Sequence, residues 1–140
     1  MRSRTPWPGW NNPRIILYHG TIRRFAERIR VEGVDTSAGR PEVDFGQGFY
    51  TTTWLKQSRS WARIQSSKME EPGALVKLTV DRTALAQLRT LVFLRADHET
   101  VDFWSFIEHC RNGNRRPPFM AEDYDVVYGP VASRWGPNDY

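Results

Sequence analysis

The chain is organised around one stretch, Asp44-Phe-Gly-Gln-Gly-Phe-Tyr-Thr-Thr-Thr53. Its two glycines, Gly46 and Gly48, permit backbone angles and close approaches that a Cβ atom would block. The aromatic residues and threonines that follow favour an extended strand. A glycine turn leading into aromatic side chains predicts a ledge on which a flat ligand could lie. A β-bulge or a tight hairpin in a packed sheet is the alternative interpretation of the same residues.

Length and composition predict a single domain that buries its own core. The 140 residues carry a net charge of +4 and one cysteine, Cys110, which excludes an intramolecular disulfide and a cysteine-based zinc site. Trp7 and Trp10 lie among prolines and glycines, so we expect an irregular arm over residues 1–13 and the domain over residues 14–140. We see no signal-peptide core and no run of about 18 apolar residues. The expected protein therefore has no membrane contact and acts in the cytoplasm or is delivered into a target cell.

Apolar periodicity predicts short strands and helices in mixed order. The expected strands cover residues 14–18, 74–80, 90–94 and 125–128, with one more in the glycine-aromatic stretch. The expected helices cover residues 22–32, 53–65 and 100–111, and residues 82–87 form a short helix or a turn. Thr21 is expected to cap the first helix and Gly33 to end it. The expected inward residues are Trp54, Ser58, Trp61, Ala62 and Gln65 in the second helix, and Phe103, Phe106, Ile107 and Cys110 in the last. Because strands and helices do not alternate regularly, we expect an α+β fold and not a doubly wound sheet.

A second stretch, Tyr18-His-Gly-Thr21, lies where the first predicted strand gives way to a helix. Such junctions leave backbone donors and acceptors without partners. His19 adds a neutral donor and acceptor near pH 7, and Gly20 would let a ligand reach the backbone itself. The alternative is the start of a helix that carries a surface histidine.

Together the two stretches resemble the ADP-ribosyltransferase superfamily, and most closely a bacterial branch of it. The Tyr-His-Gly-Thr motif, the Asp-Phe-Gly-x-Gly-Phe-Tyr-Thr-Thr motif and a helix that carries Trp61-Ala62 occur in that order. The branch also has an aromatic-rich helix that ends in arginine, here residues 102–111. A Tyr-Asp-x-Val-x-Gly-Pro-x-Ala motif follows, here Tyr124 to Ala132. The resemblance covers nearly the whole chain.

The resemblance implies a role for each matching residue. His19 would hydrogen-bond the ribose hydroxyls in the adenosine half of NAD, and Gly20 would hold the nicotinamide carboxamide through its backbone N–H and C=O. Tyr50 would stack on the nicotinamide ring. The remaining expected NAD contacts are Thr21, Gly48 and Thr51. In the alternative interpretation, the two threonines serve only as helix cap and strand.

The third catalytic element of the superfamily is an acidic residue or glutamine on a later strand, and no such motif is visible here. In the similar branch that strand follows the Gly-Pro-x-Ala segment, and this chain ends soon after it, at Tyr140. Either the natural protein continues, or a nearer residue takes the role, with Glu122, Asp123 and Asp125 as the choices. Asp125 alternatively serves the fold, because it belongs to the Tyr-Asp pattern.

As a whole, the resemblance implies an ADP-ribosyltransferase-like fold with a split mixed or antiparallel sheet and flanking helices. The implied activity is mono-ADP-ribosylation of a protein or nucleic acid, with NAD as substrate and no metal. A toxin or effector of this kind would have an antitoxin or immunity protein as a partner. Two other hypotheses remain open. One is a non-catalytic NAD- or ADP-ribose-binding module of the same fold. The other is a basic nucleic-acid-binding domain whose surface consists of Arg115, Arg116 and the aromatic N-terminal arm.

Overall fold

The computed structural model describes residues 12–40, 42–97, 99–113 and 124–131. Most of the expected N-terminal arm, the acidic residues Glu122 and Asp123, and the basic residues Arg115 and Arg116 lie outside these ranges. Within them, no helix has the length and apolar character needed to cross a membrane. The same ranges contain no cluster of three or more histidine, cysteine or carboxylate side chains that could hold a metal ion.

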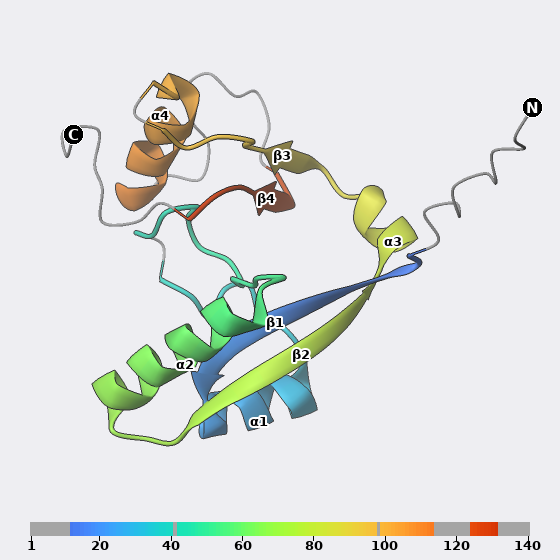
Figure 1. Cartoon of the computed structure of the whole chain (residues 1–140), viewed down its shortest axis with the longest axis vertical. Coiled ribbons are helices and arrows are strands. Elements are labelled where there is room, and N and C mark those ends of the chain that lie inside the picture. Colours follow the sequence, from blue (N-terminus) through green and yellow to red (C-terminus); the bar gives the residue numbers. More distant parts are fainter. Residues whose placement is uncertain (1–11, 41, 98, 114–123, 132–140) are drawn as a thin grey trace, which may run out of the picture.

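Two long antiparallel strands form the first part of the fold. β1 (Arg14–Ile22) pairs with β2 (Gly73–Asp81) along the full length of both strands. The helices α1 (Arg23–Glu32) and α2 (Leu55–Met69) lie on either side of this sheet (Figure 1). The predicted alternation of β2 is confirmed, because its half-buried positions are Ala74, Val76, Leu78 and Val80.

The second part of the fold combines a parallel pair of strands with a helix. α3 (Arg82–Ala86) leads from β2 to β3 (Thr90–Val92), which pairs in parallel with β4 (Val126–Tyr128). The helix α4 (Val101–Arg111) supplies the core of this part, and its predicted inward residues are all buried. The partly buried side chains that pack against this core are Phe45, Phe93 and Ala96. The chain is therefore of the mixed α+β class that the sequence predicts.

The first strand is longer than predicted, and Thr21 does not cap a helix. β1 continues to Ile22 because its pairing with β2 persists to that residue. α1 then begins at Arg23, whose N–H donates to the Pro72 carbonyl oxygen at 2.8 Å, and no side chain caps the helix. Gly33 ends α1 as predicted, with a φ of 86° that favours glycine.

Two tryptophans that the sequence predicted in the core face solvent, namely Trp54 just before α2 and Trp61 within it. Trp54 and Trp61 are 61% and 52% exposed, while Ser58 and Ala62 are buried. The physical reason lies at Gly20, where a Cβ atom would come within 2.1 Å of the Ser58 carbonyl oxygen. The backbones of α2 and β1 approach so closely that only small residues fit between them.

The glycine-aromatic stretch is a loop, where the sequence predicted a strand. A single bridge joins it to β1: the Tyr18 N–H donates to the Thr52 carbonyl oxygen at 2.8 Å, and the Thr52 N–H donates to the Tyr18 carbonyl oxygen at 2.9 Å. Gly46 has a φ of 77° and its N–H donates to the Val43 carbonyl oxygen, which turns the loop back on itself. This loop, residues 43–53, is held beside β1 without extending the sheet.

Candidate functional site

The histidine and tyrosine stretches are in direct contact in the folded chain. His19 donates a hydrogen bond from Nδ1 to the Tyr50 carbonyl oxygen at 2.6 Å. The His19 ring also stacks on the Phe49 ring, with centroids 4.3 Å apart. Two residues that are 31 positions apart in the sequence therefore build one local structure.

His19 is held as a neutral imidazole with a free acceptor. Burial lowers its pKa from the ordinary value of 6.5, and the hydrogen bond to Tyr50 offsets this only in part. Because a carbonyl oxygen can only accept, the proton of the neutral ring resides on Nδ1, and Nε2 carries a lone pair. Nε2 of His19 can therefore accept a hydrogen bond from a hydroxyl group.

Acid is expected to destabilise the protein through His19. Its folded-state pKa lies below the unfolded value of 6.5, so its contribution to stability is complete above pH 6.5 and is lost as the pH falls through the folded-state pKa. Urea unfolding at about pH 7.5 and about pH 5 measures this loss. The His19→Asn variant keeps a side-chain N–H toward Tyr50 but has no titrating ring. It should lose less free energy of unfolding than the wild type, and an equal loss would contradict the assignment.

Tyr50 is a fixed, uncharged ring that remains accessible. Its hydroxyl donates to the Gly46 carbonyl oxygen at 2.6 Å and accepts from the Phe45 N–H at 2.9 Å. Burial of this hydroxyl end raises the pKa of Tyr50 to about 12. The residue as a whole is still 40% exposed. Tyr50 thus offers a ring surface to a ligand and no acid–base group near neutral pH.

Phe45 joins the loop to two segments from the C-terminal part of the chain. Its ring contacts Phe103 and Phe106 of α4, with centroid distances of 6.4 Å and 6.1 Å. Gly129 follows β4 and lies against the same ring, since a Cβ atom there would be 3.3 Å from Phe45 Cζ. The aromatic helix and the Gly-Pro segment noted in the sequence therefore converge on the loop that carries Tyr50.

An ion pair between Asp44 and Arg111 fastens the same loop to the end of α4. Arg111 Nε donates to Asp44 Oδ1 at 2.8 Å, and a second guanidinium nitrogen lies 2.7 Å from that oxygen. Sequence reasoning did not pair these residues, although an arginine at the end of the aromatic helix was a visible signal. Nearby, burial with a smaller effect of Asp44 raises the pKa of the Cys110 thiol to about 11. Cys110 is therefore a structural side chain and not a nucleophile.

The backbone of Gly20 faces the loop side of β1. Tyr18 directs both its N–H and its C=O toward Thr52, and every second residue of a strand directs these groups to the same edge. The N–H and C=O of Gly20 consequently point to this edge, and no described loop residue pairs with them through its backbone. The close approach of α2 explains why this position is glycine, independently of any ligand.

The other three expected contact residues have different surroundings. Thr21 is buried within β1, with 6% of its surface exposed. Thr51 is exposed on the loop, and Gly48 is half-buried there. A Cβ atom at Gly48 would meet no atom of the described residues within 4 Å, so packing does not require glycine at this position. Thr21 is placed as a core residue, whereas Gly48 and Thr51 are on the same loop as Tyr50.

Comparison with known proteins gives one family match. A family model described as "Protein of unknown function (DUF3990)" matches residues 15–134. The chain belongs to the DUF3990 family. No curated protein and no solved structure matches it. The matched range contains His19, Tyr50 and Asp125, so these site residues lie within the region that defines DUF3990 proteins.

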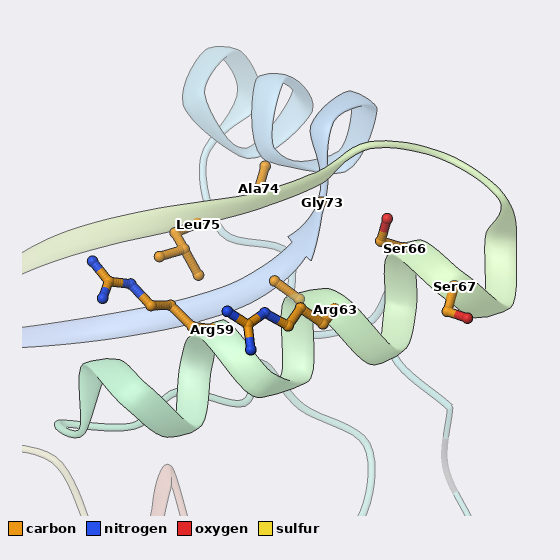
Figure 2. A pocket seen from close by; sticks show the side chains of 8 residues that line it. Arg59, Arg63, Ser66, Ser67, Gly73, Ala74 and Leu75 are labelled. Carbon is orange, nitrogen blue, oxygen red and sulfur yellow. The ribbon is translucent and has the colours of Figure 1, made fainter.

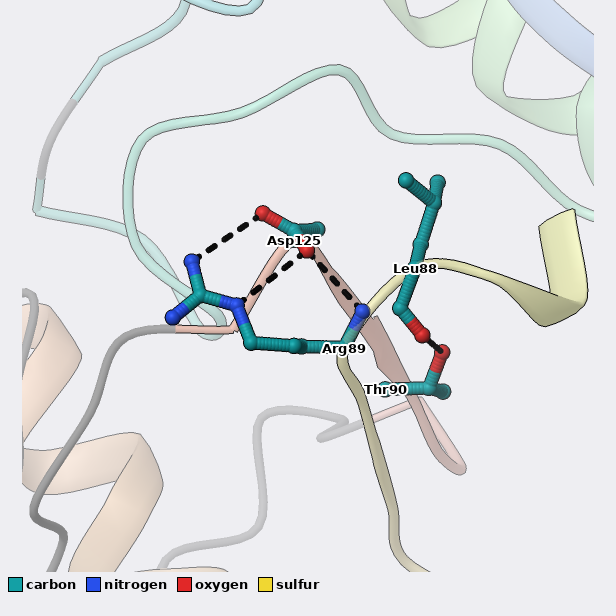
Figure 3. Close-up of polar contacts among 4 residues, drawn as sticks. All are labelled: Leu88, Arg89, Thr90 and Asp125. Carbon is teal, nitrogen blue, oxygen red and sulfur yellow. Dashed lines mark hydrogen bonds and ion pairs between the residues drawn. The ribbon is translucent and has the colours of Figure 1, made fainter. Parts of the chain in front are cut away.

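Asp125 of this DUF3990 protein fastens β3 to β4. Its carboxylate accepts from the Arg89 N–H at 2.9 Å and lies 3.4 Å from Arg89 Nε (Figure 3). The Asp125 N–H in turn donates to the Arg89 carbonyl oxygen. The backbone hydrogen bond from Arg89, followed by the side-chain contact, lowers the pKa of Asp125. The carboxylate is engaged in holding the parallel strands together, which corresponds to the structural alternative for this residue.

A cavity lined by two arginines lies between α2 and β2, outside the loop site. Its lining includes Arg59, Arg63 and Leu75, and another cavity lies beside β3 and the start of α4. His19 and Tyr50 line neither of these cavities. Sequence reasoning missed the arginine pair because it followed only the inward face of the helix. The available signal was that α2 carries four basic residues and no acidic one.

Proposed function

We propose that this DUF3990 protein is a mono-ADP-ribosyltransferase with an ADP-ribosyltransferase-like fold, and that it cleaves the bond between nicotinamide and ribose in NAD. The observation that carries the proposal is the hydrogen bond from His19 to the Tyr50 carbonyl oxygen, because it joins the two stretches on which the resemblance depends. The packing of Phe45 against α4 and Gly129 adds support, since the later motifs meet the same loop.

The polar groups around this contact match the two ends of NAD. His19 Nε2 would accept from a ribose hydroxyl, because Nδ1 is already used as a donor. A carboxamide has both donors and an acceptor, and the N–H and C=O of Gly20, which is a buried residue, would pair with them on the loop-side edge of β1. Tyr50 would stack on the nicotinamide ring through its exposed face. NAD would thus lie across the edge of β1 and the loop.

Cleavage requires that the site favour the transition state over bound NAD. Positive charge develops on the ribose as nicotinamide leaves, and a fixed pose with oriented polar groups lowers that barrier. Tyr50 is anchored by two hydrogen bonds to its own loop, so its ring needs little reorganisation to hold nicotinamide. Asp125 is engaged by Arg89, so we do not assign it to the developing cation.

A non-catalytic NAD- or ADP-ribose-binding module is the second proposal. The observation in its favour is the position of Asp125, whose carboxylate is committed to the β3–β4 pairing. In such a module, the His19–Tyr50 contact would bind the dinucleotide without transferring ADP-ribose.

Nicotinamide release separates these two proposals. We expect the purified chain to release nicotinamide from NAD, measured by chromatography, well above the rate in buffer alone. A thermal shift or calorimetric signal with NAD but no release would select the binding module. A chain that neither binds NAD nor releases nicotinamide would overturn both, whatever target is added.

A further inference from the structure

The cavity between α2 and β2 carries two arginines and is separate from the His19–Tyr50 contact. It has a volume of about 410 Å³, and Arg59 and Arg63 lie along its helix side, with Leu75 of β2 across from them (Figure 2). The loop is bridged to β1 at Tyr18, whereas the strand residues that line the cavity belong to β2. The volume falls within the range of ligand sites in proteins, roughly 300–1,000 Å³.

Among the residues that the structure describes, the arginines of this cavity have no acidic partner. Arg24, Arg28 and Arg30 of α1 form ion pairs with Glu71, Glu32 and Glu27, respectively. In the described part of the chain, neither Arg59 nor Arg63 has such a partner, and α2 contains no acidic residue. Two guanidinium groups side by side without a counter-charge repel each other, and a bound anion would relieve that repulsion.

The positive charge continues beyond the cavity along the helix. Lys56 precedes Arg59 by three residues and Arg63 by seven, a spacing that places all three on one flank of α2. Ser67 adds a hydroxyl at the far end of the cavity. A row of cations that ends in a hydroxyl group suits a polyanion with regularly spaced negative groups better than it suits a single small anion.

The opposite wall of the cavity can contact the rest of a nucleotide. Leu75 is 38% exposed and faces the arginines, and together with Ala62 of α2 it gives the cavity an apolar floor. A base can lie on an apolar floor and stack on a guanidinium plane, while the phosphates contact the charged edge. An acidic peptide would satisfy the arginines through carboxylates but has no flat group for this floor.

We propose that the α2–β2 cavity and the adjoining Lys56–Arg63 flank bind single-stranded nucleic acid. The cavity lies between one helix and one strand, which accommodates one strand with its bases turned inward and not a duplex. The inference does not depend on NAD chemistry, because neither His19 nor Tyr50 lines this cavity. If the proposed transferase activity is also correct, a nucleic acid held here would be a natural acceptor class.

The test is fluorescence anisotropy with a labelled oligo(dT) of about 12 nucleotides, titrated with the full chain in the absence of NAD. Three phosphate contacts predict a slope of about −2 for log K against log salt, at roughly −0.7 per contact on a single strand. By the same relation, Arg59→Gln with Arg63→Gln should weaken binding about 25-fold in 0.1 M salt, and Arg63→Gln alone about fivefold.

A charge-matched control is available on α1. The double variant Arg28→Gln, Arg30→Gln also removes two positive charges, but from solvent-exposed ion pairs within α1. It should leave the affinity for the oligonucleotide nearly unchanged. The proposal is overturned if the oligonucleotide does not bind, if the control weakens binding as much as the cavity variant does, or if poly-glutamate or a duplex of equal length competes as well as the single strand. Nicotinamide release, measured separately, reports on the NAD site alone.

Discussion

Nicotinamide release is expected to fall by about 100-fold or more when His19 is replaced by asparagine, the order of loss seen when one preorganised polar group is removed from a catalytic site. Asparagine places an N–H close to the position of Nδ1, so the contact with the Tyr50 carbonyl oxygen persists. It has no group at the position of Nε2, which is the acceptor that we assign to the ribose hydroxyl. The change therefore removes the proposed ligand contact and the ring stacking on Phe49, but it retains the hydrogen bond to Tyr50.

The measurement pairs nicotinamide release with NAD binding by calorimetry. Both should decrease in His19→Asn, while the thermal unfolding temperature near neutral pH changes little. Tyr50→Ala should also abolish release, whereas Tyr128→Ala, which removes another exposed tyrosine ring, should not. Full turnover in His19→Asn or in Tyr50→Ala would eliminate the site assignment.

Replacement of Gly20 by alanine is expected to destabilise the protein by about 3 kcal/mol, at the upper end of the usual cost of overpacking. The added Cβ would lie 2.1 Å from the Ser58 carbonyl oxygen and 2.8 Å from the Ala62 backbone nitrogen. Both atoms belong to the backbone of α2, so no side-chain rotation relieves the contact and the helix must move away from β1. A domain of this size would lose roughly 10 °C in melting temperature.

Gly48→Ala is the matched control for this substitution. A Cβ atom at Gly48 has no described neighbour within 4 Å, and the residue is not among those with positive φ. Its melting temperature should stay within a degree or two of the wild type, which corresponds to about 0.5 kcal/mol or less. Equal destabilisation by the two substitutions would show that the close packing of α2 on β1 is not the reason for glycine at position 20.

Local sequence patterns predicted the elements that depend on nearby residues. The alternation of Ala74, Val76, Leu78 and Val80 gave a correct strand, because period-two burial is a property of the strand itself. The apolar spacing of α4 correctly identified its buried face, and Gly33 ended α1 as expected. In each case, the information is contained within a few consecutive residues.

The errors arose where a distant partner decides the outcome. Thr21 belongs to β1 and does not cap α1, because β2 pairs with β1 as far as Ile22. Trp61 faces solvent because Ser58 and Ala62 allow α2 to approach Gly20 closely, and no periodicity rule distinguishes a small inward face from a large outward one. The loop around Tyr50 makes one bridge to β1 and does not form a strand of its own.

The sequence by itself determined the α+β class, most of the elements and the two stretches around His19 and Tyr50. The tertiary structure decided that these stretches touch, that Asp44 pairs with Arg111, and that Arg59 and Arg63 line a cavity between α2 and β2. The physical reason is the sequence distance over which each kind of interaction acts. Turn and strand preferences act over a few residues, whereas a hydrogen bond between residues 31 positions apart depends on how whole elements pack.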